Sequence, residues 1–117
     1  MAKFTRLQVW HRSRELLRLV SFFTADMRSE GDLKSQIRCA AISVASNIAE
    51  GSERRGDREF HRFLSIANGS VAEVEAQATI AGDLGCLSPD QAQRIIDQAQ
   101  IVGRMLNRLM ATVADGG

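Results

Sequence analysis

The arginine side chains that could bind an anion are concentrated in one stretch of the sequence, SERRGDREFHRF, at residues 52–63. The four candidate residues are Arg54, Arg55, Arg58 and Arg62. A guanidinium group makes planar, bidentate contacts with phosphate oxygens. A helix that starts after Gly56 would add backbone N–H groups, which also attract anions. The stretch therefore indicates a candidate phosphate-binding patch for RNA or another nucleic acid.

Carboxylates among these arginines support a second interpretation. They are Glu50, Glu53, Asp57 and Glu59. Each could neutralise a neighbouring arginine in an ion pair. The net charge of the whole chain is +1, which gives no general attraction to nucleic acid. The stretch could therefore be a solvated, charged loop, and the sequence leaves both interpretations open.

The two cysteines do not indicate catalysis or a disulfide. Cys39 lies in an uncharged stretch with no matched histidine, so it is better interpreted as a small core or interface residue. Cys39 and Cys86 are not in a paired spacing, which favours a reducing compartment. The sequence also shows no signal-peptide pattern and no stretch of about 20 apolar residues, so we expect a cytoplasmic protein that does not span a membrane.

Metal-binding and nucleotide-binding patterns are missing from the sequence. The Glu-x-x-His pairs of di-metal bundles do not occur. His11 with Glu15, and His61 with Asp57, could each form a surface pair, but such pairs have too few ligands for a typical metal site. The run EGSERRG at residues 50–56 lacks the lysine and the strand of a phosphate-binding loop. We expect no enzyme activity, no cofactor, no metal and no small-molecule substrate.

Helices must position these groups, because apolar residues recur at spacings of three and four along most of the chain. No stretch shows the alternation of a half-buried strand. The predicted helices cover residues 6–28, 33–51, 58–84 and 89–113. Four helices of this length with short loops predict an all-α, antiparallel, up-and-down four-helix bundle, forming one domain over residues 1–117.

Capping residues and glycines set the predicted helix ends. The expected caps are Thr5 with Gln8, Asp32, Asp57, and Ser88 with Gln91. Residues 51–56 are predicted to form the turn between the second and third helices. Gly85 is predicted to stop the third helix.

Residues 39–49 are uncharged, although 25% of the residues in the chain are charged. On a helical wheel Val44 and Ile48 face the core, while Ile42 and Ala49 point away from it. The third helix is similarly poor in charge between residues 63 and 82. A helix that is uncharged on all sides is buried on all sides, so we expect a second subunit to cover these helices.

The sequence therefore predicts a homo-oligomer whose interface lies on the second and third helices. The predicted interface and its polar seam comprise Gln36, Ile42, Ser43, Ser46, Asn47, Ala49, Glu50, Glu59, Ile66, Ser70 and Glu73. The polar members would hydrogen-bond with one another or with groups of the partner. Gly69 is unfavourable within a helix by about 1 kcal/mol, which indicates a packing role. The alternative is a chain with an internal hydrogen-bond network and no stable partner.

Three segments of the sequence resemble a known family. LQVWHRSREL, QIRCAAISVASNIAEGSERRGDREFHRFLSIANGSVAEVEAQ and LGCLS are similar to the four-helix bundle family that includes the 23S rRNA intervening-sequence proteins. That family is related to the accessory proteins of diversity-generating retroelements, which bind nucleic acid and a reverse transcriptase. The resemblance extends from Phe4 to about Met110 and implies an antiparallel bundle that assembles as a homopentameric ring.

Two hypotheses for the function follow. The first is a cytoplasmic, non-enzymatic homopentameric scaffold that binds RNA or a nucleic-acid-processing partner. The second is an oligomeric protein–protein interaction module with no nucleic-acid role. The retroelement accessory proteins are strongly basic, whereas this chain carries a net charge of +1, and this difference weakens the case for nucleic-acid binding.

Overall fold

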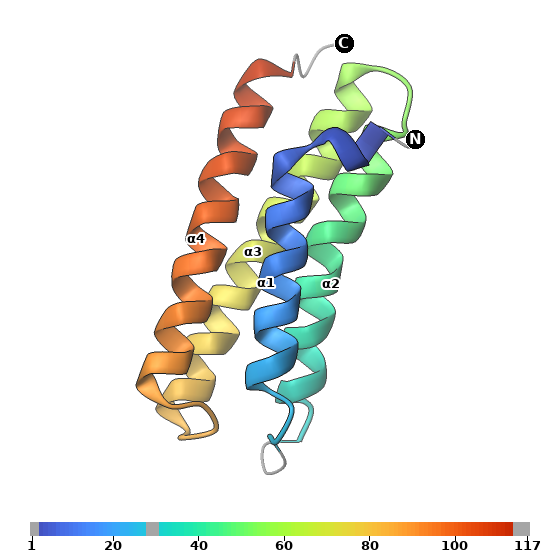
Figure 1. The fold of residues 1–117 in the computed structure, drawn as a ribbon. Helices are drawn as coiled ribbons and strands as arrows, with labels where there is room; N and C mark the ends of the chain where they lie inside the picture. Colours follow the sequence, from blue (N-terminus) through green and yellow to red (C-terminus); the bar gives the residue numbers. More distant parts are fainter. Residues whose placement is uncertain (1–2, 28–30, 114–117) are drawn as a thin grey trace.

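The computed structural model describes residues 3–27 and 31–113, and this part of the chain forms four α-helices (Figure 1). They are α1 (Gln8–Phe23), α2 (Leu33–Ser52), α3 (Asp57–Asp83) and α4 (Pro89–Thr112), preceded by a 3₁₀ turn, η1 (Lys3–Arg6). The described residues contain no strand. The all-α prediction is therefore confirmed.

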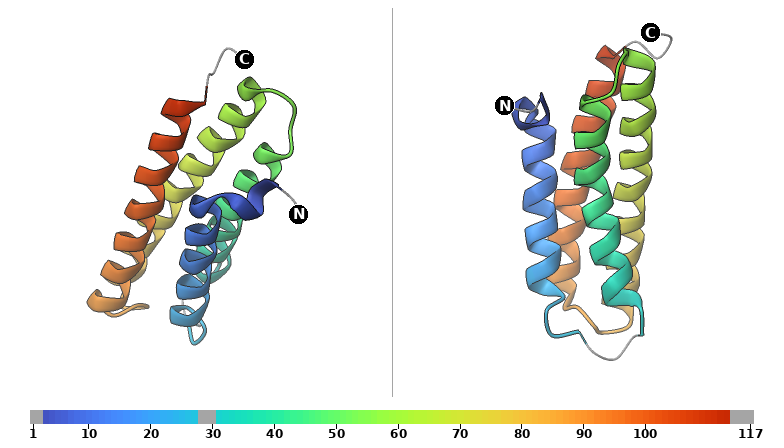
Figure 2. Two further views of the ribbon diagram at one scale, coloured as in Figure 1. Left: turned by 45° about the horizontal axis from the view of Figure 1, so that its top comes forward. Right: turned by 90° about the vertical axis from the view of Figure 1, so that its right-hand side faces the viewer.

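The four helices pack as a bundle, with successive helices running in opposite directions (Figure 1, Figure 2). Each helix contacts the two that neighbour it around the bundle, so that α1 packs between α2 and α4. The α2–α3 and α3–α4 contacts are extensive, whereas those of α1 are the least extensive. The α1–α4 side consequently lies opposite the α2–α3 side.

The core is formed by the apolar stripe of each helix. Leu16 of α1, Ile48 of α2, Leu64 of α3 and Leu106 of α4 are all fully buried. Each stripe follows the helical spacing of three and four residues that the sequence shows. Burial of these side chains supplies the main driving force for packing the helices.

Helix α1 is shorter than the predicted segment 6–28. It begins at Gln8 with Leu7 at the N-cap and no side-chain cap, so the capping box predicted from Thr5 does not form. Thr5 lies instead in η1. The helix ends at Phe23, and at its C-cap the Thr24 Oγ1 donates to the Val20 carbonyl over 2.7 Å. The predicted end at residue 28 lies outside the described residues.

Two other predicted caps also differ from the structure. Asp32 does stand at the N-cap of α2, but its side chain makes no capping hydrogen bond. The N-cap of α3 is Gly56, with φ +84°, and Asp57 is the first helical residue. A carboxylate in the first turn still interacts favourably with the helix dipole, so Asp57 supports α3 without capping it.

The predicted features of the α3–α4 connection are confirmed. Ser88 and Gln91 form a complete capping box, in which the Gln91 backbone N–H donates to Ser88 Oγ over 3.1 Å. Pro89 occupies the first helical position. Gly85 follows the end of α3 with φ +77°, a conformation that glycine adopts without steric cost.

Gly51, which the sequence places at the junction of the second helix and the following turn, lies in the last turn of α2. A Cβ at Gly51 would lie 2.6 Å from the Phe63 Cβ and 3.2 Å from Phe60 Cδ1. Glycine therefore allows α2 and α3 to approach closely at this end. The approach brings the start of α3 against the end of α2, where the arginine-rich stretch lies.

Candidate assembly face and arginine cluster

A polar seam joins α2 to α3 inside the chain. The hydroxyl groups of Ser43 and Ser70 are 2.8 Å apart and share a hydrogen bond. Asn47 Nδ2 donates to the Ser43 carbonyl over 2.8 Å and to Ser43 Oγ over 3.0 Å. Ser70 is 5% exposed, so its hydroxyl serves contacts within the chain. Three of the predicted seam residues are thus brought together by the fold of a single chain.

The seam forms the floor of a shallow groove on the outer side of α2 and α3. Gln36 and Cys39 of α2 line it opposite Glu73 and Gln77 of α3. The side-chain oxygen of Gln77 is buried and has no hydrogen-bond partner within the described residues. A buried amide oxygen without a partner is unfavourable by about 1–3 kcal/mol.

The two helices that form the groove also carry exposed apolar side chains. Ile42 of α2 is 48% exposed, and Ile66 and Ile80 of α3 are 42% and 46% exposed. Gly69 is also exposed, and a Cβ there would meet no atom within 4 Å. The packing role predicted for Gly69 is therefore not found inside this chain. We call the surface formed by Ile42, Ile66, Gly69, Ile80 and the groove between the helices the α2/α3 face.

The other residues predicted for the interface lie on or beside the same surface. Gln36, Ser46, Glu50 and Glu73 are exposed, whereas Ala49 and Glu59 are half-buried. Glu50 and Glu59 are occupied by ion pairs with arginines of the same chain. These two carboxylates connect the α2/α3 face to the arginine cluster.

Two of the four candidate phosphate-binding arginines are ion-paired around one aromatic ring. Arg54 pairs with Glu50, while Arg62 donates to Glu59 through Nε over 3.0 Å and Nη2 over 3.2 Å. The guanidinium carbons of Arg54 and Arg62 lie 5.3 Å and 4.5 Å from the centre of the Phe63 ring. Cation–π contact thus holds both arginines against α3.

The hydrogen bond from Arg62 lowers the pKa of the Glu59 carboxyl group below its usual value, and the charges of Arg54 and Arg58 act in the same direction. Reciprocally, Glu59 raises the pKa of Arg62. Both groups are therefore held in their charged forms at neutral pH. The pair neutralises much of the charge that Arg62 would offer to a phosphate.

Arg55 and Arg58 are placed differently from Arg54 and Arg62. Both are exposed, and neither has an ion-pair or hydrogen-bond partner in the part of the chain that the structure describes. Arg58 lines a shallow depression at the start of α3 together with His61 and Ser65. The predicted patch of four arginines is thus divided into a paired half and an available half.

Arg38 has a structural role that sequence reasoning missed. Its Nε donates to Thr24 Oγ1 over 2.9 Å, and its Nη2 donates to the Ser21 carbonyl over 2.8 Å. Lys34 Nζ donates to the Ala25 carbonyl over 2.9 Å. Two cations of α2 thus satisfy carbonyl groups at the end of α1, where positive charge is favourable. The available signal was a pair of basic residues one turn apart, directly after a predicted turn.

Metal-binding groups are not assembled in the described ranges. His11, considered as one half of a surface metal pair, hydrogen-bonds through Nε2 to the Thr5 carbonyl, 2.8 Å away. Within residues 3–27 and 31–113, no three His, Cys, Asp or Glu side chains lie close enough to hold a metal ion. Across the same residues, no helix is both long and apolar enough to cross a membrane.

A comparison with known protein families identifies the family of this chain. Residues 5–108 match the family described as the 23S rRNA-intervening sequence protein. The chain belongs to this family. The match includes all of α1, α2 and α3 and most of α4, so nearly the whole bundle is part of the family match.

Solved structures include a similar bundle. A protein of unknown function from the S23 ribosomal protein family of Bacteroides thetaiotaomicron VPI-5482 superposes with a TM-score of 0.77 at 19% sequence identity. The similarity covers 87% of this chain and 97% of the Bacteroides chain. At this identity the comparison establishes a shared fold. A search of curated proteins finds no match.

Proposed function

We propose that this protein is a non-enzymatic scaffold that assembles into a homo-oligomer through the α2/α3 face. The observation that carries the proposal is the exposure of Ile42, Ile66 and Ile80, each more than 40% exposed, on two neighbouring helices. Apolar patches of this kind mark interaction sites on soluble proteins. Self-association would remove these side chains from water.

Two further features support self-association through this face. Gly69 would allow the backbone of a second helix to approach closely, which explains a residue that is otherwise unfavourable within α3. The buried oxygen of Gln77 could accept a hydrogen bond from a partner side chain. The family resemblance favours a homopentamer. The unpaired Cys39 and Cys86 favour a cytoplasmic location, because disulfides persist mainly in oxidising compartments.

Light scattering tests the assembly directly. The protein is expected to have five times the mass of the 12.9 kDa chain, and Ile66→Glu is expected to give a monomer, because a carboxylate buried in an apolar contact is strongly unfavourable. Phe22→Glu is the matched control. Phe22 is 77% exposed at the end of α1, away from the α2/α3 face, so this variant should assemble normally. A wild-type monomer at micromolar concentration, or normal assembly of Ile66→Glu, would contradict the proposal.

RNA binding is a second candidate function, favoured by the two available arginines at the start of α3. Arg55 and Arg58 are exposed and form no ion pair or hydrogen bond among the described residues. In a ring, each subunit would contribute this pair of arginines, and the positive electrostatic potentials of the pairs would add. A nucleic-acid-processing protein could be recruited by the same scaffold. Without the RNA contact, the protein would act as an assembly module alone.

A salt titration of RNA binding distinguishes a scaffold that binds RNA from a module that only assembles. The logarithm of the affinity should fall linearly with the logarithm of the salt concentration, since phosphate contacts release counterions. Replacing Arg55 and Arg58 together by alanine should reduce the slope by about two. The control pair Arg54→Ala and Arg62→Ala should change it less, because those arginines are ion-paired. Absence of binding at about 50 mM salt would exclude this function.

A further inference from the structure

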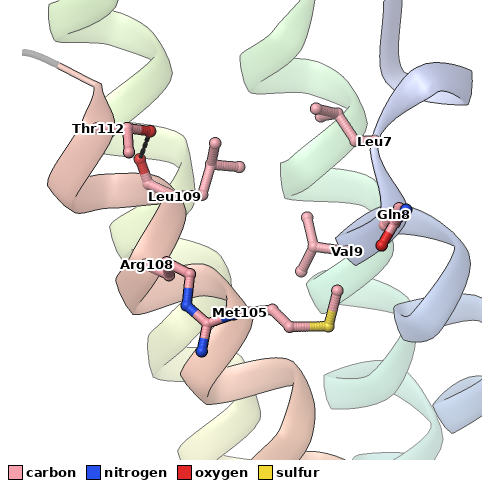
Figure 3. Close-up of a pocket in the computed structure, with 7 residues that line it drawn as sticks. All are labelled: Leu7, Gln8, Val9, Met105, Arg108, Leu109 and Thr112. Carbon is pink, nitrogen blue, oxygen red and sulfur yellow. Dashed lines mark hydrogen bonds between the residues drawn. The ribbon is translucent and has the colours of Figure 1, made fainter.

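A second unpartnered surface lies on the opposite side of the bundle, between the start of α1 and the end of α4. Figure 3 shows Leu7, Val9, Met105 and Leu109 facing one another across an open groove. The groove has a volume of about 290 Å³. Gln8, Arg108 and Thr112 complete its lining. We call this surface the α1/α4 groove. Its four apolar side chains come from both walls.

The groove is open because the N-terminal segment turns away from it. In Figure 1, η1 leaves the start of α1 and crosses toward α2, which it contacts. The backbone N–H of Lys3 donates to Glu53 Oε1 over 2.9 Å and fixes this direction. Leu7, Met105 and Leu109 pack against the core but remain only half-buried. Among residues 3–27 and 31–113, no element covers this apolar strip along α4.

Among the described residues, the charged side chain that lines the groove is a cation, Arg108. Residues 3–14 and 98–113 contain no aspartate or glutamate, although both segments carry arginines. Arg108, which lines the groove, is exposed and has no ion-pair or hydrogen-bond partner within the described residues. An apolar floor beside an unpaired arginine is complementary to a segment that presents apolar side chains next to a carboxylate.

The geometry points to an acidic amphipathic helix of a partner protein as the occupant of the α1/α4 groove. Leucine-like side chains would contact Met105 and Leu109, and a carboxylate would pair with Arg108. An amphipathic helix laid in an apolar groove is an established mode of recognition. No aromatic side chain lines the groove to stack on a nucleotide base. At about 290 Å³ and open to solvent, it is also too shallow to enclose a lipid chain.

A synthetic peptide tests this assignment on the full chain. The probe has about 18 residues, or five helical turns, with leucines at i, i+4 and i+7 flanked by glutamates and a fluorescent label at one end. Anisotropy should show saturable binding at micromolar concentrations. A scrambled peptide of the same composition, and a peptide with lysine in place of glutamate, should each bind at least about tenfold more weakly. Equal binding of either control, or no binding of the probe, would overturn the assignment.

Two matched variants locate the site. Arg108→Glu should weaken probe binding by about tenfold. The control is Arg104→Glu. Arg104 lies one turn earlier on α4 and lines a different surface, against α3, so this variant should change binding by less than about twofold. Both residues are exposed, and the two variants change the net charge equally. Equal weakening by the two variants would indicate non-specific attraction and contradict the proposal.

Methionine methyl resonances give an independent readout. In protein labelled with ¹³C at the methionine methyl groups, the probe should shift the signal of Met105, which lines the groove. Met27 is 9% exposed, does not line the groove and should remain unshifted. Light scattering should show that the oligomer stays intact, since the α2/α3 face lies on the other side of the bundle. Loss of assembly without a shift of Met105 would place the peptide on the α2/α3 face instead.

Discussion

Replacing Gly51 by alanine is expected to destabilise the protein by about 2 kcal/mol, even though alanine is the better helix former. The added Cβ would lie 2.6 Å from the Phe63 Cβ, which cannot move without its backbone. Overpacking of this kind costs about 3 kcal/mol. The gain in helix propensity returns about 1 kcal/mol. The steric clash would push the end of α2 away from the start of α3 and disturb the ion pairs on either side of Phe63.

The same substitution at Gly69 is the matched control for this prediction. Both glycines are helical, but a Cβ at Gly69 would meet no atom within 4 Å. We therefore expect Gly69→Ala to stabilise the chain by about 1 kcal/mol. Both variants should be compared by urea denaturation, followed by circular dichroism, in the Ile66→Glu background, so that assembly does not contribute to stability. Equal effects of the two substitutions would refute the close approach of α2 and α3 at Gly51.

Replacing Arg38 by alanine is expected to lower the free energy of unfolding by about 2 kcal/mol. The guanidinium group makes two charge-assisted hydrogen bonds to the end of α1, one to Thr24 Oγ1 and one to the Ser21 carbonyl. Bonds to a charged donor contribute about 1.5–3 kcal/mol each when buried, and less at this half-buried position. The substitution also removes a cation from the negative end of a helix dipole.

Conservative and neighbouring substitutions identify the cause. Arg38→Lys should recover only part of the stability, because an ammonium group cannot reproduce the forked geometry that reaches both oxygens. Lys34→Ala removes a single exposed hydrogen bond to Ala25 and should cost less than about 1 kcal/mol. These variants are compared by urea denaturation at neutral pH. If Lys34→Ala were as damaging as Arg38→Ala, general charge at the α1–α2 turn would explain the effect instead.

The sequence was most informative where a single periodic signal determines the structure. Apolar residues at helical spacing, such as Val44 and Ile48, predicted which side of each helix is buried, since burial follows directly from amphipathicity. The capping box of Ser88 and Gln91 was also predictable, because both partners lie within one turn. Local signals of this kind need no knowledge of the other helices.

Predictions failed where long-range packing competes with a local preference. Thr5 has a capping side chain, but the chain before α1 forms η1 instead, and the helix begins after it. The sequence places Gly51 at the end of the second helix but does not reveal its close contact with Phe63. For Thr5 the structure is determined by the formation of η1, and for Gly51 by a contact with α3. Local capping and turn preferences give no information about either.

The candidate site shows the same division. The arginine-rich stretch was evident from residue types alone, but its separation into paired and available arginines depends on side-chain geometry around Phe63. Likewise, Ser43 and Asn47 were recognised as polar groups in an uncharged helix. Their partner Ser70 could be assigned only once α2 and α3 were placed side by side.

The position of the single tryptophan determines what optical measurements on this protein report. The chain has one tryptophan and no tyrosine, and Trp10 lies near the start of α1 in edge contact with Phe4, with the Arg14 guanidinium over its ring. Intrinsic fluorescence is therefore a local probe of the start of α1 and its contacts with η1 and the core, whereas far-ultraviolet circular dichroism reports all four helices. Because α1 makes the least extensive contacts in the bundle, the two signals coincide during unfolding only if α1 leaves together with the other three helices.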